Sequence, residues 1–329
     1  MSVEIVKEEK LSERLGKEIH RIKLKNQNNI SVELLTYGGI LLSIMTPDRN
    51  GKRENILLAY DQIEDYIENP YYLNANIGLT AGRIRDGEFI IDDVAYKVPV
   101  NNDINCLHGG PNGLHTKIWQ IESFQATCEF EEIILKTHHM HLEDGFPGNI
   151  DIKAIYRLNN ENTLEIIYRA ETDRSCTLNL TNHNYYNLSG AALDEIGEQE
   201  LFVNAAYYKA IDAHSLPVEE LVSCRDSDFD FTKSSALQKA LTKGLDHPFC
   251  IEHKVDESMP DVVYKDPKSG RVMSISTNQE AVVIYSNNGP FKTHRGICFE
   301  TQGYPNQIYV LDAEDTYLSE TRIKFDVEA

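Results

Sequence analysis

The chain carries short runs of hydrophobic residues separated by turn-forming residues, rather than long segments of helical periodicity. Three pairs of such runs flank polar turn residues, and Asn-Gly is an especially strong hairpin signal. The pairs are 40–46 and 54–59 around Asn50-Gly51, 87–91 and 94–98 around Asp92-Asp93, and 152–158 and 164–170 around 159–162. Each pair predicts a β-hairpin.

The run 164–170 alternates between apolar and charged positions. Its apolar face is formed by Leu164, Ile166, Tyr168 and Ala170. Glu165 and Arg169 fall on the opposite face. A period of two residues is typical of a strand that buries only one face.

Helix signals are few. Residues 61–68 are expected to form one short helix that ends before Pro70. Ser235 and Gln238 have the spacing of a capping box for a second helix at 236–243, which Gly244 would end. Many strands with few helices predict an all-β fold, a large antiparallel β-sandwich with a few short helices. Without a visible repeat or linker, we expect one domain over residues 1–329.

Composition narrows the class of partner. The 329 residues include 32 Lys and Arg against 52 Asp and Glu, a net charge of −20, and 41% are hydrophobic. Such a chain buries a sizeable core, while its acidic surface repels nucleic acid and anionic membranes. A neutral small molecule is the expected partner. No secretory signal or apolar run of ~18 residues is visible, and the six cysteines are widely spaced. We therefore expect a soluble cytoplasmic protein with reduced thiols.

Two histidine segments are candidates for chemistry. His108 precedes Gly109-Gly110, where the backbone can turn sharply and approach a ligand, although an ordinary turn has the same pattern. Residues 181–187 contain three amides, one histidine and two tyrosines. In an extended chain His183, Tyr185 and Asn187 share a face that suits a polyhydroxylated ligand. Alternatively, this is a polar strand whose tyrosines fill the core.

Two carboxylates are further candidates. Glu300 and Gln302 share a face at the end of the apolar run that begins at Gly296. Partial burial would raise the pKa of Glu300 towards values useful for a general base, whereas most strand-end glutamates are simply solvated. Asp246 lies two residues before Pro248, a position common for residues that only form turns.

A metal site is the weaker interpretation of His139 and His141, which would share one strand face. Glu143 follows His141 too closely to complete a familiar ligand set. We expect the segment 138–141 to be a solvated strand end near Asp144-Gly145, and we predict no bound metal. Common nucleotide, hydrolase and zinc-protease motifs are not visible in the sequence.

Taken together, six segments resemble the aldose 1-epimerase (galactose mutarotase) family in sequence and order, across roughly residues 20 to 325. The segments are 81–89, 96–110, 145–149, 181–190, 244–249 and 300–302. The resemblance implies a β-sandwich with an open carbohydrate cleft. It also implies a cofactor-free reaction that interconverts the α and β anomers of a free aldose such as galactose or glucose.

The resemblance also implies roles for individual residues. Glu300 resembles the family's general base and His183 its general acid, while His108 would polarise the anomeric centre. The expected substrate-binding residues are Arg83, Asp246, Gln302 and Tyr185. The chemistry fits, because ring opening removes a proton from the C1 hydroxyl and gives one to the ring oxygen. With ordinary pKa values of ~4.3 for Glu and ~6.5 for His, both required forms are accessible near neutrality.

Two positions depart from the family motif. Leu79 replaces an arginine, and Gly82 replaces an asparagine whose amide often contacts the sugar. We expect altered selectivity between galactose and glucose, or a preference for another aldose or the reducing end of an oligosaccharide. The alternative is a non-catalytic sugar-binding or sensing sandwich of the same fold. A binder would not require Glu300, His183 and His108 together, so the enzyme is favoured.

Overall fold

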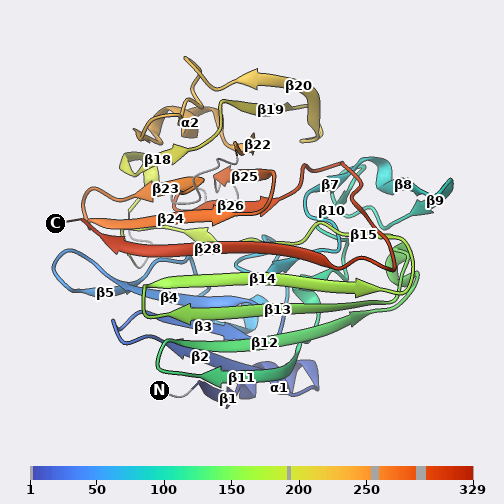
Figure 1. Ribbon diagram of the computed structural model, residues 1–329, viewed down its shortest axis with the longest axis horizontal. Coiled ribbons are helices and arrows are strands. Elements are labelled where there is room, and N and C mark those ends of the chain that lie inside the picture. The colour runs from blue at the N-terminus through green and yellow to red at the C-terminus, as the bar shows by residue number, and fades with distance from the viewer. Residues whose placement is uncertain (1–2, 191–193, 253–258, 287–293, 329) are drawn as a thin grey trace.

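The computed structural model describes residues 3–190, 194–252, 259–286 and 294–328. Most of the elements are β-strands, which confirms the predicted all-β class. Figure 1 shows a broad sheet that runs across the whole molecule, with further strands stacked above and behind it. Neither α-helix in the described residues is long and apolar enough to cross a membrane.

The broad sheet has nine strands, and its hydrogen-bonded pairs are antiparallel. In spatial order they are β11 (Gln120–Ala126), β12 (Phe130–His139), β13 (Ile150–Asn159), β14 (Thr163–Thr172), β28 (Tyr317–Val327), β24 (Arg271–Thr277), β23 (Val262–Lys265), β18 (Glu200–Val203) and β21 (Ser235–Ala236). Strand β28 lies in the middle, where it joins the half built from β11–β14 to the half built from later strands.

Two smaller sheets accompany the nine-stranded one. The five-stranded sheet contains β1 (Glu4–Lys7), β2 (His20–Lys25), β3 (Ser31–Leu35), β4 (Leu41–Pro47) and β5 (Arg53–Asn55). The six-stranded sheet contains, in spatial order, β17 (Tyr185–Tyr186), β26 (Ile297–Gln302), β25 (Ala281–Ser286), β22 (Asp246–Cys250), β19 (Tyr207–Ile211) and β20 (Pro217–Ser223).

Short elements connect these sheets. Four two-stranded pairs are β7 (Arg83–Ile84) with β10 (Cys106–Leu107), β6 (Asn76–Ile77) with β16 (Thr181–Asn182), β8 (Glu88–Ile91) with β9 (Val94–Lys97), and β15 (Cys176–Thr177) with β27 (Val310–Leu311). The helices are α1 (Glu9–Leu15), α2 (Gln238–Lys243) and the 3₁₀ turns η1 (Ile63–Tyr66), η2 (Arg85–Gly87), η3 (Leu114–Thr116), η4 (Glu143–Gly145) and η5 (Ile196–Glu198).

The three predicted hairpins are confirmed as β4–β5, β8–β9 and β13–β14. In β14 the alternation also holds, because Leu164 and Tyr168 are buried while Arg169 is exposed. The apolar faces of β2–β4 and β12–β14 enter one hydrophobic core, which places the two sheets face to face as a sandwich. In Figure 1 the blue strands correspondingly overlap the green ones.

The helix predictions are only partly correct. Residues 61–68 contain the 3₁₀ turn η1 instead of an α-helix. Helix α2 is present near its predicted place, but Ser235 does not cap it, because this residue belongs to β21 and its hydroxyl donates to the carbonyl of Asp230 at 3.3 Å. Helix α1 was not predicted; it ends at Gly16, which has the left-handed φ of 63°. All six cysteines are free, as expected.

Candidate active site

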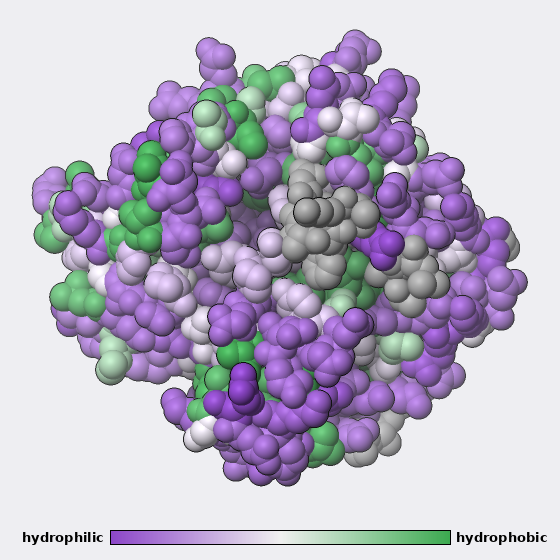
Figure 2. Space-filling view, turned by 180° about the vertical axis from the view of Figure 1, so that it is seen from behind, coloured by the Kyte–Doolittle hydropathy of each residue, from purple (hydrophilic) through white to green (hydrophobic). Residues whose placement is uncertain are grey.

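A single cleft brings the predicted site residues together from distant parts of the chain. Its volume is about 240 Å³, slightly below the ~300–1,000 Å³ usual for pockets that hold drug-sized ligands. Its lining includes all seven residues predicted from the sequence: Arg83, His108, His183, Tyr185, Asp246, Glu300 and Gln302. The surface seen from behind in Figure 2 is hollowed near its middle and is mostly hydrophilic. A cleft of this size suits a small polar ligand.

Strand β26 supplies Glu300 to the cleft. Side chains two residues apart share a strand face, so Cys298, Glu300 and Gln302 point to the same side. Glu300 was expected at a solvated or partly buried strand end, but it lies within the strand and is only 3% exposed. Flanking strands explain this burial, because β26 is paired with β25 along its length and with β17 at Cys298.

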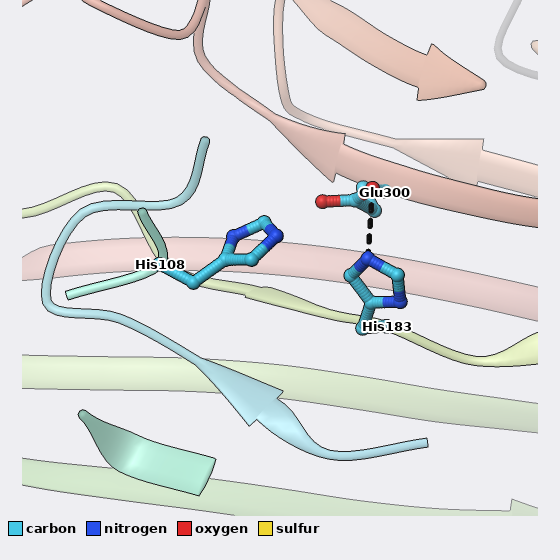
Figure 3. Close-up of side chains that lie close together, drawn as sticks. All are labelled: His108, His183 and Glu300. Carbon is cyan, nitrogen blue, oxygen red and sulfur yellow. Dashed lines mark ion pairs between the residues drawn. The ribbon is translucent and has the colours of Figure 1, made fainter. Parts of the chain in front are cut away.

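His183 lies between β16 and β17, where its backbone is held on both sides. Its amide donates to the carbonyl of Ala75 at 3.0 Å, and its carbonyl accepts from the amide of Asn74 at 3.0 Å. The imidazole Nε2 lies 3.5 Å from Oε1 of Glu300 (Figure 3). On the other side of the ring, Nδ1 lies 3.6 Å from Sγ of Cys298. His183 therefore faces β26 with both nitrogens.

The turn predicted at His108 is real, and its glycines are required. His108 has a φ of 54°, and a Cβ at Gly109 would lie 2.0 Å from the carbonyl oxygen of Gly78. The backbone amide of Gly82 donates to Nδ1 of His108 at 3.1 Å. Nδ1 must therefore be the unprotonated nitrogen, so that Nε2 carries the proton of the neutral ring. His108 offers the cleft a hydrogen-bond donor.

Burial changes the proton affinities of these groups. It raises the pKa of Glu300 well above its ordinary value, with help from the charge of Asp246 and against the opposing charge of Arg83. It lowers the pKa of His183 to about 4 and that of His108 well below 6.5. Ordinary pKa values would give a carboxylate and an imidazolium, whereas burial favours a protonated Glu300 beside a neutral His183.

Aromatic rings create this apolar surrounding. The His183 ring centroid lies 5.0 Å from that of Tyr185, 6.0 Å from that of Tyr285 and 5.2 Å from that of His108. Tyr72 also packs against His108, at 4.8 Å. The two histidines are thereby desolvated, although they line a cleft.

Polar groups line the rest of the cleft. Arg83 donates from Nε to Oδ1 of Asn102 at 2.9 Å, and its Nη1 lies 3.4 Å from Oδ2 of Asp246. Gln302 donates to the carbonyl of Gly303 at 3.2 Å. Its buried Oε1 has no hydrogen-bond partner among the described residues. That oxygen can accept a hydrogen bond from a hydroxyl of a bound ligand.

Two expectations for the segment 181–187 differ from the structure. Asn187 does not share the cleft face with His183; its amide donates to the carbonyls of Asp194 and Arg295, each at 2.8 Å. The chain is not one extended strand here, so a period of two does not continue through it. Tyr185 does line the cleft, but its hydroxyl donates to the carbonyl of Tyr71 at 2.8 Å. It contributes mainly its ring.

The His139 and His141 segment is separate from the cleft. The expected solvated strand end holds for His138 and Met140, which are exposed, but not for His139, which is buried with its Nε2 3.3 Å from the carbonyl oxygen of Phe146. In the described residues, the group with metal-ligand composition is His108, His183 and Glu300, whose ligand atoms lie within 4.8 Å of one another. The proton on Nε2 of His108 makes this ring a donor rather than a metal ligand.

The two departures from the family motif have different surroundings. Leu79 is 4% exposed and belongs to the hydrophobic core. Gly82 lines the cleft with a φ of 74°, and a Cβ there would lie 2.5 Å from Cβ of Pro305. Pro305 therefore occupies the space into which a side chain at position 82 would extend.

Sequence reasoning missed several residues at the cleft. The cleft lining also includes Tyr72, Asn102, Tyr285 and Pro305, and Cys298 lies behind His183. Cys298 lies in the run recognised as apolar, and Tyr285 lies in the neighbouring strand β25, for which nothing in the sequence indicated proximity to the cleft. Tyr72 lies in a loop two residues after Pro70. Its own φ of 54°, which is unusual for a tyrosine, was not predictable from the local composition.

Comparisons with known proteins agree with this geometry. A family model described as aldose 1-epimerase matches residues 20–321. The galactose mutarotase of Bos taurus is 29% identical over 296 residues, covering 85% of this chain and 84% of that protein. The aldose 1-epimerase of Streptococcus thermophilus is 29% identical over 273 residues, covering 82% and 78%. The crystal structure of galactose 1-epimerase from Lactobacillus acidophilus superposes with a TM-score of 0.88 at 26% identity, covering all of both chains.

Proposed function

Because the chain belongs to the aldose 1-epimerase family, we propose that this cleft binds a free aldose and that Glu300 and His183 open and reclose its ring. The protein is an isomerase with mutarotase activity on aldoses. The observation that carries the assignment of residues is the convergence of His108, His183 and Glu300, all buried, at one cleft.

At the start of the proposed cycle, the Glu300–His183 pair holds one proton. Transfer of that proton across the 3.5 Å between Oε1 and Nε2 gives a carboxylate and an imidazolium. The carboxylate then takes the proton of the C1 hydroxyl while the imidazolium protonates the ring oxygen, and the C1–O5 bond breaks. Rotation about C1–C2 presents the other face of the aldehyde. Reclosure reverses both transfers and restores the pair, so protons balance without an added reagent.

His108 would act as a fixed donor in this cycle. Its Nδ1 accepts a hydrogen bond from the backbone amide of Gly82, so its Nε2–H remains available to donate to a sugar oxygen at every step. Burial keeps the pKa of His108 well below its ordinary value, which prevents it from competing for the proton of the pair. We therefore assign it to polarisation and orientation of the sugar at the anomeric centre.

The cleft composition favours a neutral sugar. One guanidinium, that of Arg83, accompanies the two carboxyl groups of Asp246 and Glu300 among the lining residues. No positive charge remains for a phosphate or carboxylate on the substrate. Arg83, Asp246 and Gln302 offer donors and acceptors for the hydroxyls, and the Tyr185 ring offers an apolar wall. Galactose and glucose are the proposed substrates, and the reducing end of an oligosaccharide is the alternative.

The protein's setting is also a proposal. Six free cysteines, two of them not buried, fit a reducing compartment, so we place the enzyme in the cytoplasm. We treat residues 1–329 as one domain, since β28 pairs with both β14 and β24.

Polarimetry tests this function directly. Freshly dissolved α-D-galactose and α-D-glucose are followed with and without the protein, and a faster approach to an unchanged final rotation is expected. His183→Asn serves as a folded control in which the acceleration should be lost. Sugar binding by folded protein without acceleration would instead indicate a non-catalytic sugar-binding protein.

A further inference from the structure

The contact between His183 and Cys298 is not used in the reaction described above. Cys298 is fully buried and lies two residues before Glu300 on the same face of β26. Its Sγ is 3.6 Å from Nδ1 of His183, while Oε1 of Glu300 is 3.5 Å from Nε2. One strand therefore contacts both nitrogens of the same imidazole, one through a thiol and one through a carboxyl group.

The position of this thiol is rigidly determined. Cys298 is paired with Tyr185 of β17 on one side and with Tyr285 of β25 on the other. Both tyrosine rings also pack beside His183. Because His183 is anchored through its backbone to Ala75 and Asn74, small shifts of either partner are resisted. The sulfur thus limits rotation of the ring about its Cβ–Cγ bond.

A thiol suits this position because it adds no charge. Burial raises the pKa of Cys298 well above its ordinary value, so the group stays neutral. A neutral sulfur is a weak hydrogen-bond partner. A carboxylate in its place would favour the imidazolium permanently and weaken His183 as an acid.

We propose that Cys298 is a positioning residue for the epimerase reaction, whose thiol holds Nδ1 of His183 so that Nε2 faces Glu300 and the sugar. The proposal rests on the proposed function of the cleft. Cys298 acts through His183 and does not touch the substrate. Its loss should lower the rate of proton transfer while the affinity for sugar remains.

The kinetic test uses Cys298→Ala and Cys298→Ser, with Cys176→Ala as a matched control. Cys176 is equally buried but lies in β15, away from the cleft. For Cys298→Ala we expect kcat to fall about two- to five-fold, the lower part of the range for one hydrogen bond because the thiol is a weak partner, with KM within two-fold of wild type. Cys298→Ser should give an intermediate kcat, because its shorter C–O bond places a polar partner farther away. The control should keep wild-type kcat.

Several results would overturn the proposal. They are a wild-type kcat in folded Cys298→Ala, a Cys298→Ser variant no faster than Cys298→Ala, or an equal loss in Cys176→Ala. A wild type that does not accelerate mutarotation would reject the proposed function itself.

A second measurement does not depend on activity or sugar. Long-range ¹H–¹⁵N NMR correlations of the sugar-free protein report which ring nitrogen of His183 carries the proton. We expect one tautomer, protonated at Nδ1, in wild type and in Cys176→Ala, and a mixture in Cys298→Ala. An unchanged tautomer in Cys298→Ala would contradict the role of the thiol, even if that variant lost activity through altered packing.

Discussion

Replacing Glu300 by glutamine should abolish most activity and make the protein more stable. Gln matches Glu in shape and fills the same buried place, which is 3% exposed. It cannot accept the proton of the C1 hydroxyl. Losing one positioned acid–base group typically costs ~10²–10⁴ in rate, or about 2.7–5.5 kcal/mol in the activation barrier. A folded variant should therefore retain at most about one hundredth of the wild-type kcat.

The stability change has a definite pH dependence. The pKa of Glu300 is raised in the fold, so the folded wild type holds a proton that the unfolded chain releases above pH ~4.3. The stability from this proton is complete below that pH and is lost as the pH rises towards the raised folded pKa. Gln requires no proton. The advantage of Glu300→Gln should thus be smallest near pH 4 and grow by at most about 1.4 kcal/mol per pH unit above it.

Urea unfolding at pH 4, 6 and 8, together with polarimetry, measures both effects. Glu219→Gln is the control, because Glu219 is exposed on β20 and the change is chemically identical. It should alter neither kcat nor the pH dependence of the unfolding free energy. The reasoning fails if folded Glu300→Gln keeps more than a tenth of the wild-type rate, or if its stability relative to wild type is independent of pH.

Two further predictions concern pH and selectivity. The acid limb of the wild-type kcat/KM profile should lie near pH 4, where the Glu300–His183 pair gains a second proton, since the pKa of His183 is lowered to about 4; an acid limb near pH 6.5 would instead indicate a solvated histidine. Gly82→Asn should destabilise the fold by about 1–3 kcal/mol, because its Cβ would lie 2.5 Å from Cβ of Pro305. Pro305→Gly, which removes that Cβ, should restore part of this loss in the double variant. Denaturation midpoints measure this loss of stability, and the galactose-to-glucose ratio of kcat/KM measures the effect on selectivity. An unaffected midpoint in Gly82→Asn would contradict the steric argument.

Hairpins could be predicted from the sequence, because a tight turn depends only on the few residues that form it. Asn50-Gly51 and Asp92-Asp93 each lie between residues that pair as neighbours, so the hairpins β4–β5 and β8–β9 follow from short stretches of sequence. The order of the nine-stranded sheet did not follow in this way. Its central pairing joins Leu164 to Ile323, which are far apart in the chain. Nothing in the sequence around either residue indicates that the two strands are neighbours.

The site was predictable in its residue types but not in its electrostatics. The motifs at His108, His183 and Glu300 identify the candidates. Their protonation depends on Tyr185 and Tyr285, which come from separate strands and exclude water from His183. Asn187 was assigned to the cleft because an unbroken strand was assumed, whereas the backbone turns away between β17 and the next segment.

The central place of β28 has a consequence for how the chain acquires its structure during synthesis. Strands β11–β14 can pair in order as they leave the ribosome, because each hairpin closes locally. The partner of β14 on its open side, β28, is translated only after β24 and the strands of the six-stranded sheet. Until then β14 exposes an unpaired edge, which is the kind of surface that favours aggregation. Nascent chains halted before residue 317 should therefore depend on chaperones more than the complete sequence does.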